Sequence, residues 1–136
     1  MANAVYPIWK QELLQGTAGT SLGGTVKAAL IDTGAYTYNA AHDFWDDASA
    51  GVIGTPQTLS NKTFVNGVFK NTAALTYTAV SGNSVEAIII YLDTGTPATS
   101  RLVAYIDTSQ TGLPVTPNGG NIVYTPDTGA NGIFSL

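Results

Sequence analysis

The sequence predicts a mainly β protein, an antiparallel β-sandwich or barrel with a short N-terminal helix. Short runs rich in Val, Ile, Tyr and Thr recur along the chain, and turn residues separate them about every ten positions, as in sandwiches and barrels. The 136 residues fit one domain, and an apolar fraction of 44% is enough for one core. We therefore expect a single β-rich domain over residues 1–136, in which residues 1–24 form a helix and a linker arm.

The N-terminal segment is predicted to be a helix followed by a linker. Pro7 suits the first helical position, where its missing N–H needs no partner. Gly16 suits the position just after the last turn. Trp9 and Leu13 share one face of this helix. Residues 17–24 are rich in Gly, Thr and Ser and are expected to be the linker.

The first half of the chain continues with segments of β character. Residues 25–32 form an apolar, strand-like run, and two tyrosines alternate with Thr at 36–38 in a short strand or arm. Residues 40–47 suit one or two helical turns. Residues 52–59 contain Pro56, which predicts an edge strand or an extended loop because Pro cannot donate a backbone hydrogen bond.

The second half gives the strongest strand signals. Residues 85–92 are an apolar run interrupted only by Glu86, and residues 101–107 are the next strand, so we expect these two at the heart of a sheet. Asn66-Gly67 predicts a hairpin with a type I′ turn. Shorter strands are expected at 62–65, 68–69, 75–79, 121–125 and 132–136, with loops at 93–100 and 108–120.

Charge is scarce in this chain. Only 10% of the residues are Asp, Glu, Lys or Arg, where about 25% is typical. A soluble monomer normally carries charge over its surface, and here Thr, Ser, Asn and Gly take that place. This composition favours a protein with large contact areas on neighbouring subunits.

Several partners are excluded by composition. The net charge is −4 and the five basic residues are scattered, so no patch can neutralise phosphates and no nucleic-acid partner is expected. There is no cysteine for a disulfide or a thiolate metal site. The strongest apolar stretch, 87–92, is too short to cross a bilayer, and residues 1–7 lack signal-peptide features. We expect no membrane partner and synthesis in the cytoplasm.

The tripeptide Asp-Thr-Gly occurs three times, at 32–34, 93–95 and 127–129. The first copy resembles the active-site motif of retroviral-type aspartic proteases, in which two carboxylates share a proton. Asp32 would then pair with a symmetry mate or with Asp93. The same tripeptide is also turn chemistry, because Asp accepts a hydrogen bond from the backbone ahead and Gly permits positive φ. We expect turns, since no flap hairpin accompanies the motif.

The densest polar cluster consists of His42, Asp43, Asp46 and Asp47. It suits a divalent metal or a His/Asp acid–base pair, and it equally suits the first turn of a short helix. It lacks the alternating spacing of a calcium loop, and no Cys or G-x-S-x-G nucleophile is present. We predict no enzyme, no catalytic, cofactor-binding or metal-ligating residue and no cofactor, and leave open whether this cluster takes up a metal.

Aromatic residues concentrate in the first third of the chain. Such side chains fill cores, stack on sugars, or anchor subunit interfaces. Tyr6 and Trp9 lie near the N-terminus, and Phe44 and Trp45 lie in the acidic segment. We predict these four as candidate subunit-interface residues.

Ten runs of residues cover nearly the whole chain: 4–7, 9–10, 24–33, 36–38, 42–44, 60–69, 86–95, 100–107, 112–120 and 132–136. In these runs the sequence resembles the small structural proteins encoded by tailed bacteriophages. The resemblance implies a non-enzymatic virion component, made in the cytoplasm of a bacterial host. It carries no functional site with it.

The first expectation from this resemblance is a capsid decoration or cement protein that stabilises the phage head. It would be a homo-oligomer bound to the major capsid protein or to other virion subunits. The alternative within the virion is a small tail or head–tail connector subunit. Alternatives of other classes are a carbohydrate-binding module and a retropepsin-like aspartic protease.

Overall fold

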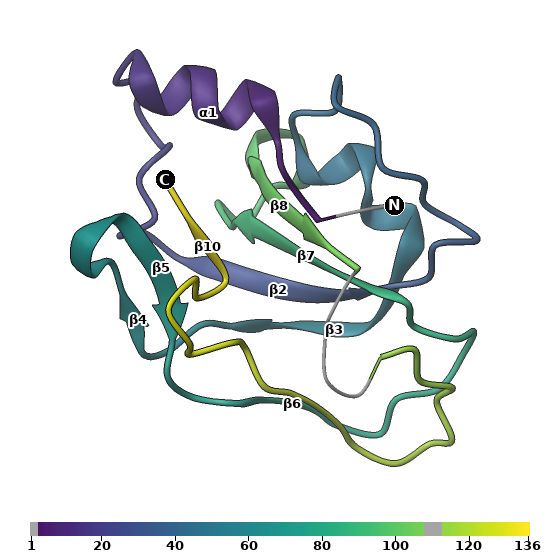
Figure 1. Cartoon of the computed structure of the whole chain (residues 1–136). Coiled ribbons are helices and arrows are strands. Elements are labelled where there is room, and N and C mark those ends of the chain that lie inside the picture. The colour runs from purple at the N-terminus through teal and green to yellow at the C-terminus, as the bar shows by residue number, and fades with distance from the viewer. Residues whose placement is uncertain (1–2, 108–112) are drawn as a thin grey trace.

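The computed structural model describes residues 3–107 and 113–136 and shows a mainly β chain (Figure 1). Within these residues there are ten strands in antiparallel sheets and one short α-helix, so the predicted fold class is confirmed. The strand orders are β1-β8-β7-β2-β3, β10-β5-β4 and β6-β9, and none of these sheets closes into a barrel within the described ranges. Buried side chains from all three sheets form one hydrophobic core.

The elements have the following bounds. The strands are β1 (Ala4–Val5), β2 (Val26–Ile31), β3 (Val52–Thr58), β4 (Lys62–Thr63), β5 (Val68–Asn71), β6 (Leu75–Tyr77), β7 (Ala87–Leu92), β8 (Leu102–Ile106), β9 (Ile122–Tyr124) and β10 (Phe134–Ser135). The α-helix is α1 (Pro7–Leu14), and the short 3-10 helices are η1 (Trp45–Asp47), η2 (Ser49–Gly51), η3 (Val65–Gly67) and η4 (Pro97–Thr99).

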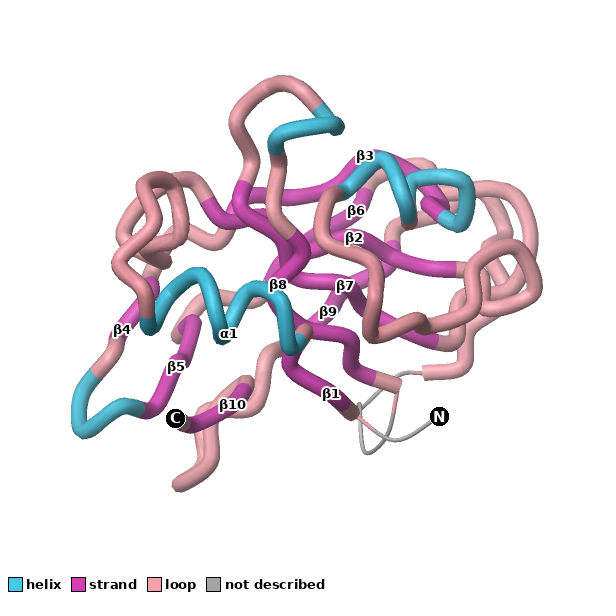
Figure 2. Tube along the Cα trace, turned by 90° about the horizontal axis from the view of Figure 1, so that it is seen from above, coloured by secondary structure: helices cyan, strands magenta, loops and turns pink. Residues whose placement is uncertain are grey.

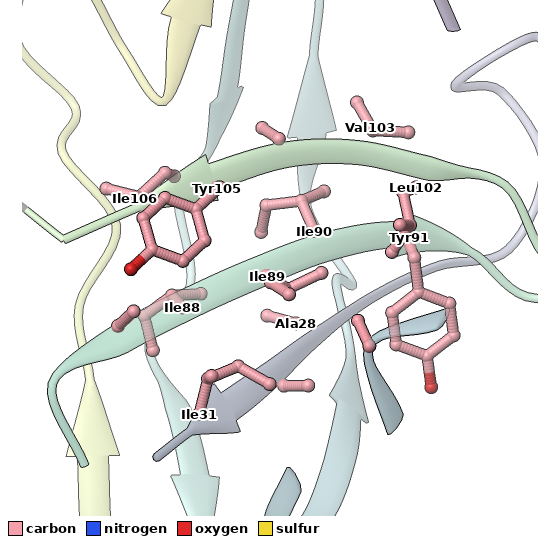
Figure 3. Close-up of a cluster of buried hydrophobic side chains, with 14 of the residues drawn as sticks. Ala28, Ile31, Ile88, Ile89, Ile90, Tyr91, Leu102, Val103, Tyr105 and Ile106 are labelled. Atoms are coloured by element: carbon pink, nitrogen blue, oxygen red, sulfur yellow. The ribbon is translucent and has the colours of Figure 1, made fainter. Parts of the chain in front are cut away.

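The middle of the five-stranded sheet is β7, between β8 and β2, as the sequence predicted. Every residue of β7 and β8 is buried. Figure 3 shows Ile88, Ile89 and Ile90 of β7 between side chains of β2 and β8. A strand covered on both faces has no reason to alternate apolar with polar residues, which explains the continuous apolar runs.

Side chains of the central sheet alternate between its two faces. Ile89 pairs with Tyr105 across β7 and β8 and therefore shares a face with it, and Tyr91 lies two residues further along β7 on the same face. Trp45 stacks on Tyr91, with 4.3 Å between ring centroids, and Tyr38 lies 5.4 Å from Tyr105. The segment between β2 and β3 therefore covers this face with aromatic rings.

The helix α1 begins and ends where the sequence predicts. Pro7 occupies its first position, and Gly16, just beyond its end, has a φ of 72°, which Gly adopts without steric cost. Trp9 is its buried residue. The preceding strand β1 pairs with β8. Two residues are too short to show a periodic pattern, and the sequence therefore did not indicate this strand.

Some expected elements differ in the structure. Residues 36–38, expected as a short strand or an arm, form a loop in which Tyr38 packs on Tyr105 of the central sheet. β6 ends at Tyr77, since Ala79 has a positive φ of 51° that breaks the predicted alternation. The loop expected at 108–120 is described only from residue 113, because residues 108–112 lie outside the described ranges.

The strand β3 lies at the edge of the central sheet, as its proline predicted. The pairing of β2 with β3 shifts register between Ile53 and Gln57, around Pro56. The Tyr77 hydroxyl donates to the carbonyl oxygen of Ala28 at 2.7 Å. That bond pairs a backbone group of β2 beside the irregular stretch, so β6 stabilises the sheet edge.

The predicted hairpin joins β4 to β5. Asn66 and Gly67 both have positive φ, 56° and 75°, as a type I′ turn requires. Paired residues begin at Thr63 and Lys70, so the connection is longer than two residues. β10 pairs with β5, and both views place β4, β5 and β10 together at one end of the molecule beside α1 (Figures 1 and 2).

Gly132, just before β10, occupies a position that excludes other residues. Its φ is 58°, and a Cβ there would overlap the carbonyl oxygen of Phe69. Gly132→Ala is expected to lower the free energy of unfolding by about 2–3 kcal/mol, from backbone strain and overpacking together, as measured by urea denaturation. Gly119→Ala is the matched control, because Gly119 also has positive φ but has nothing within 4 Å of the added Cβ.

In Gly119→Ala the free energy of unfolding should fall by only about 1 kcal/mol, the cost of the left-handed backbone alone. Equal losses in the two variants would show that crowding around Gly132 has no energetic effect.

Candidate interaction surface

The four aromatic residues predicted for a subunit interface do not gather on one surface. Tyr6, Trp9 and Trp45 are only 0, 1 and 7% exposed, so these side chains pack inside the subunit. Phe44 is partly exposed, and the guanidinium of Arg101 lies 5.1 Å from the centroid of its ring. Of these four side chains, Phe44 is the most exposed in this fold.

The polar atoms of these buried aromatics have partners within the chain. The Tyr6 hydroxyl is hydrogen bonded to the Tyr36 hydroxyl at 2.9 Å, which lies 3.0 Å from Nδ1 of His42. Burial, and then the hydrogen bond to Tyr36, raises the pKa of Tyr6. The Trp9 Nε1–H donates to the carbonyl oxygen of Thr20 at 3.0 Å. Satisfied polar groups of this kind are typical of core residues.

The three Asp-Thr-Gly copies form the same turn. In each, the aspartate Oδ1 accepts a hydrogen bond from the backbone N–H of the glycine two residues later, at 2.8 Å for Asp32, 3.0 Å for Asp93 and 2.7 Å for Asp127. Such a bond from an Asp side chain to the backbone two residues on defines an Asx-turn. The turn interpretation of the motif is confirmed.

Pairing of Asp32 with Asp93 within one chain is excluded by the register of the sheet. Asp32 directly follows β2 and Asp93 directly follows β7, and these strands run antiparallel over six paired positions. The two carboxylates therefore lie at opposite ends of the ladder, roughly 20 Å apart. The N–H of Gly95, and then Lys27 at 3.1 Å, hold the pKa of Asp93 below its ordinary value.

The acidic cluster around η1 does not converge on a point. Asp47 Oδ2 accepts a hydrogen bond from the backbone N–H of Asp43 at 3.2 Å, while His42 faces Tyr36. Throughout residues 3–107 and 113–136, no group of three or more His, Cys, Asp or Glu side chains is placed to hold a metal ion. The Asp47 carboxylate thus stabilises the start of η1.

A cavity of about 360 Å³ opens where β2 and β8 end, and its lining includes Tyr36, Tyr38, Tyr105 and Glu86. The Glu86 carboxylate accepts hydrogen bonds from the backbone N–H and the hydroxyl of Thr33, both at 2.9 Å. It also accepts one from the Ser84 hydroxyl. The two Thr33 donors tie Glu86 to the first Asp-Thr-Gly turn, so the carboxylate holds this turn against the start of β7.

Four other large apolar side chains are exposed. They are Leu14, Phe64, Val65 and Leu136, which are 87, 45, 72 and 67% exposed. They come from the end of α1, from the connection between β4 and β5, and from the residue after β10, which share one end of the molecule in both views (Figures 1 and 2). We call these four residues the apolar end.

A groove of about 360 Å³ is lined by two of these residues, Phe64 and Leu136, whereas Leu14 and Val65 lie outside its lining. Its lining includes Trp9, Leu13, Phe64, Phe69, Phe134 and Leu136. Phe64 stacks on Phe69 with 5.5 Å between ring centroids and 4° between planes. None of the described side chains that line the groove is ionisable. The site is therefore suited to binding an apolar surface.

Sequence reasoning missed this surface although one signal was present. Phe64 and Val65 stand directly before the Asn66-Gly67 turn, and an apolar side chain at a turn tip has little core to reach. Leu136 could not be recognised in the same way, because its exposure depends on how β10 pairs with β5.

Comparison with models of protein families finds no match for this chain, and comparison with curated proteins finds none either. In the part of the chain that the structure describes, no helix is long and apolar enough to cross a membrane.

Proposed function

We propose that this protein is a non-enzymatic structural subunit of a virion and acts as a capsid decoration or cement protein. The observation that carries the proposal is the apolar end, four large exposed apolar residues on a chain with only 10% charged residues. Large apolar side chains exposed beside an apolar groove often mark a contact with another protein. The resemblance to small structural proteins of tailed bacteriophages suggests the type of assembly.

The mechanism we propose is cross-bridging of neighbouring capsid subunits. A protein that binds the assembled shell but not its free parts stabilises the shell by mass action. The single core and the double-covered central sheet suit a rigid bridging body. With no cysteine in the chain, the stability of this body depends on packing and not on disulfides.

Removal of the protein tests this role. Virions that lack it are expected to release their DNA at a lower temperature and under a milder osmotic shock than complete virions, because fewer contacts resist the internal pressure. DNA release can be followed with a fluorescent DNA dye during heating. Re-addition of the purified protein should restore the original release temperature. Release that is unchanged by removal would rule out a decoration role.

The number of copies per particle separates this proposal from a tail or head–tail connector subunit. A decoration protein is expected at hundreds of copies, and a connector ring at about a dozen, because such rings have closed cyclic symmetry. A sugar-binding platform built on Trp9 or Trp45 is disfavoured, since both rings are buried and offer no face for stacking.

A further inference from the structure

We infer that the cavity where β2 and β8 end binds a neutral saccharide. The cavity has a volume of about 360 Å³, which lies in the range of small-molecule sites. It shares no lining residue with the apolar groove beside Phe64 and Leu136. The inference goes beyond the proposed function and does not depend on it, because it concerns a different site and a different kind of ligand.

The charges around the cavity exclude an anionic ligand. Glu86 and Asp107 line the cavity, and its described lining contains no Lys, Arg or His. Two carboxylates repel a phosphate, a sulfate or another carboxylate at short range. The ligand is therefore neutral or positively charged.

The packing of the tyrosines decides between a neutral and a positively charged ligand. An organic cation is held by the open faces of aromatic rings, but Tyr36 and Tyr105 are only 4 and 2% exposed. Tyr38, whose ring centroid lies 5.4 Å from that of Tyr105, is only partly buried. One partly open ring among hydroxyl groups suits a sugar, which has an apolar C–H face and a polar rim, better than it suits a cation.

Glu86 supplies a fixed hydrogen-bond acceptor at the cavity. Its carboxylate accepts hydrogen bonds from the backbone N–H and the hydroxyl of Thr33, both at 2.9 Å, and one from the hydroxyl of Ser84. An ionised carboxylate has about four acceptor positions, so one remains for a hydroxyl of the ligand. The three existing bonds hold the carboxylate in place, and little side-chain freedom is lost when a ligand binds.

The Tyr38 hydroxyl supplies a hydrogen-bonding group that the fold leaves unused. Among residues 3–107 and 113–136 this hydroxyl has no hydrogen-bond partner, and it is not one of the buried polar atoms. The Tyr36 hydroxyl, by contrast, is bonded to Tyr6 and His42. A hydroxyl and a carboxylate with unused capacity on one cavity match a ligand whose own hydroxyls both donate and accept.

The test is a microarray of neutral, sialylated and sulfated oligosaccharides, probed with the purified full-length chain. The wild type is expected to bind neutral members and none of the charged ones. Isothermal titration calorimetry with the best neutral oligosaccharide then compares variants. Tyr38→Phe removes only the hydroxyl and should weaken binding about three- to tenfold, whereas Tyr38→Ala also removes the ring and should weaken it more than about tenfold.

The matched control is Tyr124→Phe, the same substitution at a tyrosine outside the cavity lining, and it should bind like the wild type. Circular dichroism checks that each variant is folded. If Tyr38→Ala does not fold, the comparison of Tyr38→Phe with Tyr124→Phe decides alone. Failure to bind any neutral oligosaccharide overturns the inference, and so does binding that Tyr38→Phe leaves unchanged. Tighter binding of choline than of every neutral oligosaccharide also overturns it, because the cavity would then be a cation site.

Discussion

Alkaline solution is expected to unfold this protein between about pH 10 and pH 12. All seven tyrosines have a raised pKa in the folded chain, and burial is the largest cause for each. Burial, followed by the charge of Asp93, raises the pKa of Tyr91 to about 12. Burial, followed by the charge of Asp107, does the same for Tyr105.

The direction in which stability changes with pH follows from the number of protons that the folded and unfolded states bind. Above about pH 10 the tyrosines of the unfolded chain ionise, while the buried ones stay protonated until about pH 12. The folded state then binds more protons, so stability falls as pH rises. Five tyrosines are at most 3% exposed: Tyr6, Tyr77, Tyr91, Tyr105 and Tyr124. In this pH range their ionisation in the unfolded chain lowers the free energy of unfolding by roughly 5–7 kcal/mol per pH unit. A whole domain has a stability of only about 5–15 kcal/mol.

The measurement combines tyrosinate absorbance with far-ultraviolet circular dichroism during a titration with base. Both signals are expected to change together in one steep transition, because ionisation requires unfolding. Tyr91→Phe keeps the ring that stacks on Trp45 and removes one titrating phenol, so its transition should move to higher pH. Smooth ionisation near pH 10 with unchanged dichroism would contradict the expected burial.

The central strands could be predicted from the sequence because their apolar runs have one physical meaning. Residues 85–92 are too apolar for a surface strand and too short for a buried helix, and turn residues bound them on both sides. The same reasoning located β2 and β8. The pairing partners could not be read in this way, since register depends on contacts between distant segments, such as β1 with β8.

The aromatic residues show where sequence reasoning reached its limit. Large aromatic side chains are equally suited to a core and to an interface, because both environments bury large rings. Only the fold decides, and it places Tyr38 and Trp45 over the central sheet and Tyr6 beside Tyr38. The apolar end was missed for the complementary reason, that Leu14 and Leu136 are ordinary residues whose exposure is set by tertiary packing.

Truncation of Trp9 tests directly whether this side chain belongs to the core of the subunit. Trp9 is 1% exposed, its ring meets Phe134 edge-on at 5.8 Å between centroids, and its N–H is bonded to Thr20. Trp9→Ala is expected to lower the free energy of unfolding by about 3–5 kcal/mol, from lost burial and the cavity that remains. Urea denaturation measures the loss directly.

The helix supplies its own control for this variant. Gln11→Ala lies on the same helix at an exposed side chain, so the free energy of unfolding should change by no more than about 0.5 kcal/mol. Trp9→Phe should fall between the two, because it keeps most of the buried ring but leaves the Thr20 carbonyl without its donor. A purely interfacial Trp9 would give the opposite order, with a stable alanine variant that no longer associates. The order of these three free energies therefore decides whether Trp9 belongs to the core of the subunit or to its surface.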